Sequence, residues 1–135
     1  MTVYVYPTDL QASAATDLEY QWRWLSNGTV EHPSPAEVDL TDATAAATVW
    51  DPLTFQTAIL AVSTTPDGAG SAISFFTPDG GTVMSGAQLL VKAADLRTIP
   101  FLPPFQDWRG AWKMAVTLAS GLVVPFAGGS FWLTP

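Results

Sequence analysis

The chain has 135 residues, a length that suits one domain with a single hydrophobic core. Its residues are 48% hydrophobic and only 13% charged, and 12 acidic residues against 5 basic ones give a formal net charge of -7. This balance disfavours binding to a nucleic-acid backbone or an anionic membrane surface, and the absence of cysteine excludes disulfides and thiolate metal sites.

The N-terminus does not have the pattern of a secretory signal. Residues 1–7 contain no basic segment and reach Pro7 before an apolar stretch forms, and no later apolar stretch is long enough for a membrane span. We therefore expect a protein that is made and folded in the cytoplasm. Residues 1–17 are interpreted as an N-terminal arm or edge strand, and residues 18–135 as the main domain.

Alternating apolar and polar residues predict the first long strand at Leu18–Trp24. Asn27-Gly28 favours a tight hairpin turn that leads into a short strand at residues 29–32. After two prolines, Glu37–Thr41 reads as a further extended segment. We interpret Ala43–Trp50 as one strand because its short alanine run is flanked by Thr and continues into Val and Trp.

The middle of the chain alternates short strands with turns. Strands are predicted at residues 55–62, Ala72–Phe76 and Gly86–Lys92, and the pattern of the last one leaves open which face is buried. Ala93–Leu96 is the one plausible helical turn. Residues 99–105 are predicted to form an exposed connection, because three prolines there lack the N–H groups that a strand ladder needs.

The last third of the chain predicts three more strands. Ala111–Leu118 alternates strongly, a Ser120-Gly121 turn leads into Leu122–Phe126, and Gly128-Gly129 precedes a final strand at Ser130–Thr134. The total of eight or nine short strands, with turn signals between them, is typical of an all-β sandwich or barrel, and we predict a β-sandwich.

The order of these features resembles a family of small phage β-sandwich domains, found at the N-terminus of siphophage upper-baseplate proteins and in lower tail-fibre proteins. The resemblance rests on these segments: Tyr20–Trp24, Val38–Ala45, Leu60–Thr64, Thr82–Val91, Ala94–Pro100, Trp112–Leu118, Ser120-Gly121 and Val123–Phe131. It implies a single immunoglobulin-like antiparallel sandwich of about seven to nine strands. It also implies a structural role in the virion, in the tail, baseplate, connector or head surface.

Aromatic residues outside the predicted core, with a neighbouring leucine and arginine, are the candidate partner contacts. Trp22, Trp24 and Trp112 lie on the apolar phase of their strands and are predicted to be core residues. Trp108 follows the proline-rich loop, which either covers one open end of the sandwich or forms a contact surface. The N-terminal tyrosines raise the same question, since a strand there can add to a neighbour's sheet. The candidate contacts are Tyr4, Tyr6, Phe101, Leu102, Phe105, Trp108 and Arg109.

The sequence offers no motif for catalysis or for a metal site. His32, the one histidine, lies in a predicted turn without a nucleophile motif nearby. The pairs Asp39/Asp42 and Asp67/Asp79 can be considered for glycoside hydrolysis, but turn aspartates usually accept hydrogen bonds from their own backbone. No loop has the ligand spacing of a calcium site. We expect no catalytic residue, metal or cofactor, and no enzyme activity.

The leading hypothesis is therefore a virion structural protein, localised in the particle after synthesis in the host cytoplasm. Its expected partners are other virion structural proteins, and it is expected to be a homo-oligomer in the assembled particle, without direct contact to nucleic acid or membrane. The alternative is a carbohydrate-binding module, in which Trp and Tyr side chains on a sheet face stack on sugar rings. A third hypothesis, a hydrolase, needs a perturbed carboxylate or histidine in a pocket.

Overall fold

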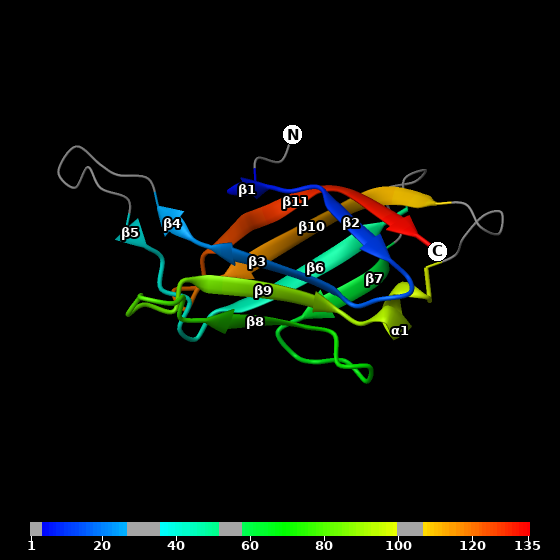
Figure 1. The fold of residues 1–135 in the computed structure, drawn as a ribbon. Helices are drawn as coiled ribbons and strands as arrows, with labels where there is room; N and C mark the ends of the chain where they lie inside the picture. The colour runs from blue at the N-terminus through cyan, green and yellow to red at the C-terminus, as the bar shows by residue number, and fades with distance from the viewer. Residues whose placement is uncertain (1–3, 27–35, 52–57, 100–106) are drawn as a thin grey trace.

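The computed structural model describes residues 4–26, 36–51, 58–99 and 107–135. These residues form eleven strands and one short helix, arranged as two packed sheets and a separate two-stranded ribbon (Figure 1). The elements are β1 (Tyr6–Pro7), β2 (Leu10–Ser13), β3 (Leu18–Arg23), β4 (Leu25–Ser26), β5 (Ala36–Glu37), β6 (Thr44–Trp50), β7 (Ala58–Ser63), β8 (Ala72–Phe76), β9 (Gly86–Val91), α1 (Ala93–Leu96), β10 (Trp108–Thr117) and β11 (Val123–Thr134). The predicted all-β fold is confirmed.

The larger sheet has the strand order β1-β11-β10-β6-β7, and β2 also pairs with β11. The smaller sheet has the order β3-β9-β8, and β4 pairs with β5 in a separate ribbon. Most pairs are antiparallel, as predicted, but β1 and β2 both run parallel to β11. In both pairs a strand from the beginning of the chain lies beside the strand at its end (Figure 1).

Period-two alternation explains which side chains enter the core. In β10 the side chains of Trp112, Met114 and Val116 are buried, and their neighbours along the strand point outward. In β9 the buried set is Ala87, Leu89 and Val91, which settles the orientation that the sequence left open. The alanine-rich segment is a strand, β6, as predicted, because its small side chains alternate between the core and the outer face.

The prediction of two strands separated by Gly128-Gly129 is wrong, because β11 runs without interruption from Val123 to Thr134. Glycine weakens an isolated strand, but this one is paired along β10 on one side and with β1 and β2 on the other. The ring of Tyr4 also lies over Gly128, where an added Cβ would come within 2.4 Å of Tyr4 Cζ. An aromatic ring over a strand glycine replaces the packing that the missing side chain would supply.

The predicted extended segment at residues 37–41 is a strand only at its start, where β5 ends at Glu37. The Asp39 carboxylate then accepts hydrogen bonds from the Thr41 backbone N–H (3.0 Å) and the Thr41 hydroxyl (2.6 Å), which closes a turn. Asp42 continues this turn with a φ of 62°. The predicted hairpin tip at Asn27-Gly28 and the strand at residues 29–32 lie outside the described residues.

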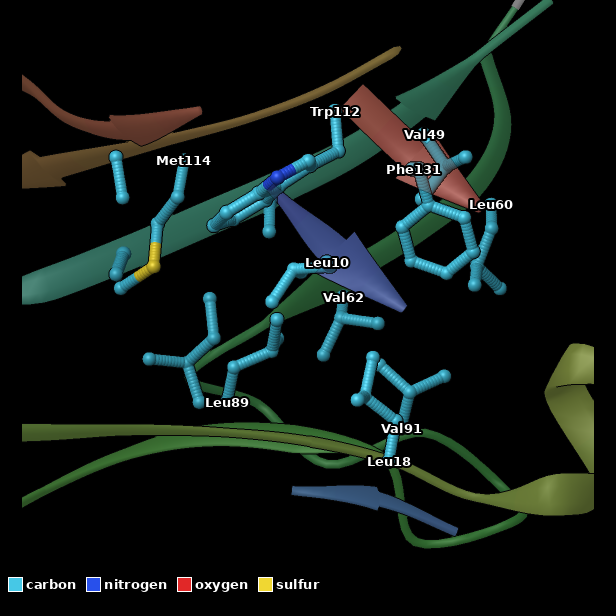
Figure 2. Packing of buried hydrophobic residues seen from close by; sticks show 14 of the residues in the cluster. Leu10, Leu18, Val49, Leu60, Val62, Leu89, Val91, Trp112, Met114 and Phe131 are labelled. Atoms are coloured by element: carbon cyan, nitrogen blue, oxygen red, sulfur yellow. The ribbon is translucent and has the colours of Figure 1, made fainter. Parts of the chain in front are cut away.

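The core lies between the two sheets, with side chains of both pointing toward one another (Figure 2). Phe126 is fully buried, and its ring lies 5.7 Å from that of Trp22 and 5.0 Å from that of Trp24. Trp22, Trp24 and Trp112 are all buried, so the prediction that they are core residues is confirmed. Each buries a large apolar area, and the ring contacts of Trp22 with Trp112 and Phe126 join β3 of the small sheet to β10 and β11 of the large one.

The N-terminal segment joins the two sheets. Its strands pair with β11, while the Tyr6 hydroxyl donates to the Arg23 carbonyl (2.8 Å) at the end of β3. The Thr8 carbonyl accepts from the Trp112 indole (2.8 Å), and the Thr8 hydroxyl accepts from the Trp22 indole (3.2 Å). Leu10, Ala12 and Ala14 also belong to the core. Of the two interpretations of residues 1–17, the segment from Tyr6 to Ser13 therefore has the structure of an edge strand and not of a free arm.

Candidate contact surface on the large sheet

The side of the large sheet that faces away from the core is here called the outer face. It consists of the even-numbered residues 44–50 of β6, the odd-numbered residues 109–117 of β10, and Val123, Pro125, Ser130 and Trp132 of β11. The strand register places these side chains in rows, such as Thr44, Thr117 and Val123. Most of them are small or apolar, and Arg109 and Lys113 are the charged residues in this set.

Both charged residues of the outer face lie over tryptophan rings. Arg109 is directly opposite Trp132 in the β10–β11 ladder, and its guanidinium carbon lies 4.4 Å from the ring centroid. The Lys113 ammonium lies 4.8 Å from the ring centroid of Trp50, on the neighbouring strand β6. The Trp132 indole donates to the Asp107 carboxylate at 2.8 Å. These cation–π contacts hold two long side chains flat against the sheet.

The cations of the outer face differ from the others in the chain. Arg23 forms an ion pair with Glu37, and Lys92 forms one with Asp17 (3.2 Å). Arg97 donates to the Ala14 carbonyl, and its charge contributes to the lowered pKa of Asp17, which is caused first by the Ala93 N–H. Arg109 and Lys113 form no ion pair with any carboxylate of the described residues, and their charges lie over tryptophan rings instead. The outer face therefore offers positive charge on a protein whose net charge is strongly negative.

A depression of about 320 Å³ lies beside Lys113. The ring of Tyr4 forms one wall of it, and Ala46, Ala115, Val123 and Pro125 contribute an apolar lining. Nearby, the Thr48 hydroxyl and the Trp50 indole N–H are buried and have no hydrogen-bond partner in the described part of the chain. A buried donor without a partner costs about 1–3 kcal/mol, so these two side chains have hydrogen-bonding groups that a partner could pair.

The outward face of the small sheet has a different character. Gln21 of β3 donates its side-chain amide to Gln88 of β9 at 2.9 Å, and Ser74 of β8 lies in the same row. Glu19 and Arg23 add charges of both signs to this face. Such a polar, mixed-charge surface is typical of a sheet face in contact with water, so the outer face of the large sheet is the stronger candidate for a partner contact.

The structure separates the contact residues that were predicted from the sequence. Arg109 belongs to the outer face, and the ring of Tyr4 lies over Gly128 and borders the depression beside Lys113. Tyr6 is engaged by its own chain, since its ring packs edge-on against Phe126 (5.3 Å) and its hydroxyl is hydrogen-bonded. Trp108 lies on the core-facing phase of β10 and packs against the buried ring of Phe131 at 6.3 Å. Phe101, Leu102 and Phe105 lie outside the described residues.

Three residues of the outer face are absent from the contacts predicted from the sequence: Trp50, Lys113 and Trp132. A usable signal existed, because Trp50 follows the buried Val49, and Trp132 lies between the buried Phe131 and Leu133. Alternation places both tryptophans outward. Their pairing with Lys113 and Arg109 depends on the strand register, which no local pattern contains.

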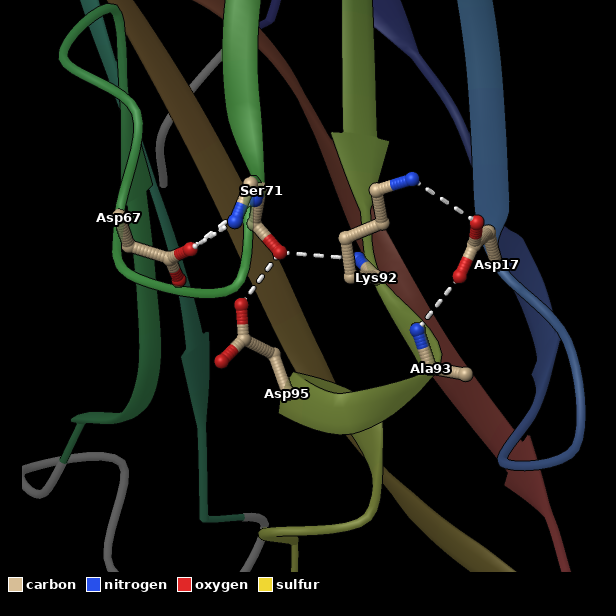
Figure 3. A network of polar contacts seen from close by, with 7 residues as sticks. Asp17, Asp67, Ser71, Lys92, Ala93 and Asp95 are labelled. Atoms are coloured by element: carbon tan, nitrogen blue, oxygen red, sulfur yellow. Dashed lines mark hydrogen bonds and ion pairs between the residues drawn. The ribbon is translucent and has the colours of Figure 1, made fainter.

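A second polar cluster joins the loop before β8 to α1 (Figure 3). The Asp67 carboxylate accepts from the backbone N–H groups of Ala69, Gly70 and Ser71, at 2.9 to 3.0 Å. The buried Ser71 hydroxyl donates to Asp95 and accepts from the Lys92 backbone N–H at 2.8 Å. The interpretation of Asp39 and Asp67 as turn residues that bind their own backbone is thus confirmed.

The two carboxyl groups of this cluster influence each other. The hydrogen bond with Asp95, assisted by backbone N–H groups, lowers the pKa of Asp67. The same contact with Asp67, together with partial burial, raises the pKa of Asp95 above its ordinary value of 3.8. The hydrogen bonds of the Asp67 and Asp95 carboxylates are made to groups of the same chain, so the cluster attaches the loop before β8 to α1. Within the described residues, no group of three or more His, Cys, Asp or Glu side chains is arranged to hold a metal ion. His32 lies outside the described residues.

Comparison with known proteins adds no family assignment. No protein-family model matches the chain, and no curated protein matches it in sequence. In the part of the chain that the structure describes, no helix has the length and apolar character needed to cross a bilayer.

Proposed function

We propose that the chain is a structural protein of a bacteriophage particle, which acts through protein–protein contacts and performs no reaction. The outer face of the large sheet carries this proposal. It combines small apolar side chains with two tryptophans, an arginine and a lysine, and aromatic residues and arginine are the types enriched at the centres of protein interfaces. The resemblance of the sequence to small phage β-sandwich domains is the reason for proposing that this particle is a bacteriophage virion.

The alternative is a carbohydrate-binding module, and the geometry of the outer face weighs against it. A sugar ring stacks on an uncovered aromatic face, but Arg109 lies over the ring of Trp132 and Lys113 over that of Trp50. A sugar would have to displace a cation from each ring before it could stack. A protein partner, in contrast, gains from the same cations, because they are already held in place.

The proposal is tested on purified particles of the phage that encodes the chain. Antibodies raised against the recombinant protein are used for immunogold labelling, and mass spectrometry measures the copy number per particle. We expect several copies at one fixed location. If the chain is abundant in the infected cell but absent from density-purified particles, the proposal is wrong. A glycan array with the wild type and with W50A/W132A tests the alternative, which predicts sugar binding that this variant loses.

A further inference from the structure

We infer that the outer face binds the acidic end of a second copy of the same chain, in a head-to-tail contact. This rests on the proposed function, because it names the partner of the contact surface on which that function depends. The acidic end is defined by four carboxylates, Glu37, Asp39, Asp42 and Asp79, at the end of the sandwich where β5 ends and β9 begins.

Several contacts bring these carboxylates to one end of the molecule. The Leu40 N–H donates to the Met84 carbonyl at 2.8 Å, which ties the turn of Asp39 and Asp42 to the segment before β9. The Ser85 hydroxyl donates to Glu37 at 3.3 Å, and a Cβ added at Gly81 would lie 3.3 Å from Glu37 Oε1, so the turn that contains Asp79 adjoins Glu37. Arg23 neutralises one of the four charges.

The acidic end is negatively charged at neutral pH. The Thr41 hydroxyl and N–H lower the pKa of Asp39, so its carboxylate stays ionised at neutral pH. On the outer face, Arg109 and Lys113 are held over tryptophan rings and lack a carboxylate partner among the described residues. The positive charges of one copy therefore complement the negative charges of the next, and complementary charge guides the orientation of a contact.

Charge also decides between the two ways in which copies can meet. A symmetric contact of two outer faces would bring Arg109 and Lys113 of one copy toward the same residues of the other, and like charges at an interface are unfavourable. A head-to-tail contact avoids this repulsion. Repeated around an axis, such a contact produces a ring, and without closure it produces a filament.

The size and lining of the outer face suit a contact of this kind. With strands about 4.8 Å apart and a rise of about 3.4 Å per residue, the outer-face strands β6, β10 and β11, together with the neighbouring strand β7, offer roughly 600 Å² in projection, about three quarters of the about 800 Å² that each partner contributes to a standard interface. The apolar depression beside Lys113 supplies a surface from which water is readily expelled.

The first experiment measures self-association by sedimentation velocity over a concentration series, at low and at high salt. We expect assemblies that dissociate as salt rises, because charge pairs across the contact are screened. R109Q/K113Q removes two positive charges from the outer face and is expected to raise the dissociation constant about tenfold or more. The matched control T65E/S74E lowers the net charge equally at exposed positions away from both surfaces, and should associate like the wild type. Circular dichroism verifies that each variant folds.

A mixing experiment identifies the partner surface. R109E/K113E reverses the charge of the outer face, and D42N/D79K removes the excess charge of the acidic end, with Asn chosen because it tolerates the positive φ at position 42. Neither variant alone should associate, but a mixture should form a 1:1 complex, since the unchanged face of one meets the unchanged acidic end of the other.

Two results would overturn the inference. One is a wild type that stays monomeric at every concentration at low salt, and the other is association that is lost in R109Q/K113Q but not restored in the mixture. Either result leaves the proposed function standing, because the presence of the chain in purified particles is measured independently.

Discussion

Gly128 and Gly129 are adjacent in β11, but an added methyl group meets a different obstacle at each position. At Gly128 it meets the side chain of Tyr4, which can move away, and at Gly129 it lies 2.4 Å from the Thr8 carbonyl oxygen, which belongs to the paired backbone. We therefore expect G129A to lower the free energy of unfolding by about 1–3 kcal/mol, as overpacking typically does, and G128A to lower it less. Urea denaturation measures both values.

The variant Y4A provides the control for this pair. Without the tyrosine ring, the methyl group of G128A has room, so Y4A/G128A should be no less stable than Y4A. The same background should not rescue G129A, because the Thr8 backbone is unchanged. Equal costs for G128A and G129A, or rescue of both by Y4A, would show that the Tyr4 ring is not the obstacle at Gly128.

Asp67 and Asp95 are expected to have opposite effects on the pH dependence of stability. The pKa of Asp67 is lowered in the folded state, so its contribution is present above 3.8 and is lost as the pH falls through the folded pKa. The pKa of Asp95 is raised, so its contribution is complete below 3.8 and is lost as the pH rises through the folded pKa. The cluster is therefore most favourable in mildly acidic solution, between these two pKa values.

Two isosteric variants separate these effects. At neutral pH D67N should be less stable than the wild type, because a neutral amide replaces the carboxylate that accepts three backbone N–H groups. D95N should be more stable at neutral pH, because it removes a carboxylate next to Asp67 while the amide oxygen still accepts from Ser71. Urea midpoints at pH 7.5, 5 and 3.5 test this. The advantage of D95N should shrink as the pH falls, and an advantage that stays constant would contradict the assignment.

At the scale of single residues, much of the outer face was within reach of sequence reasoning. Alternation in β10 already separated Lys113 from the core residues Trp112 and Met114, and the same rule assigns Trp132 to the outside. The cation–π pairs were out of reach, because they join residues of different strands through a register set by the whole sheet. Trp108 shows the opposite case, in which a residue that looked free is used by the core.

At the scale of secondary structure, the strands were more predictable than their partners. The segments Ala72–Phe76 and Ala93–Leu96 agree with the predicted bounds, because local alternation and turn residues determine them. The parallel pairing of β1 and β2 with β11 joins the two ends of the chain, and no local pattern reports it. For the same reason β11 was split at its glycines, since the strands that support it there are distant in sequence.

The link between the N-terminal segment and the small sheet can be tested at Thr8. Its hydroxyl accepts from the Trp22 indole, so T8V, which preserves the shape but removes the acceptor, leaves a buried donor unpaired. We expect T8V to lose about 1–2 kcal/mol of the free energy of unfolding, measured by urea denaturation. T8S retains the hydroxyl and should lose clearly less. If T8V is as stable as T8S, the hydrogen bond does not contribute to holding β1 and β2 against β3.

At the scale of the whole molecule, the N-terminal strands β1 and β2 pair with the C-terminal strand β11, and we therefore predict a single cooperative unfolding transition. The core forms one cluster to which Leu10 at the start of the chain and Leu133 at its end both belong. Removing the N-terminal strands would uncover one edge of β11, and releasing β11 would withdraw Phe126 from the core and expose β10, so neither can unfold alone without exposing core residues. Far-UV circular dichroism and tryptophan fluorescence should therefore give coincident urea transitions. An early fluorescence transition, with the strand signal unchanged, would instead mean that residues 1–17 detach as a separate arm.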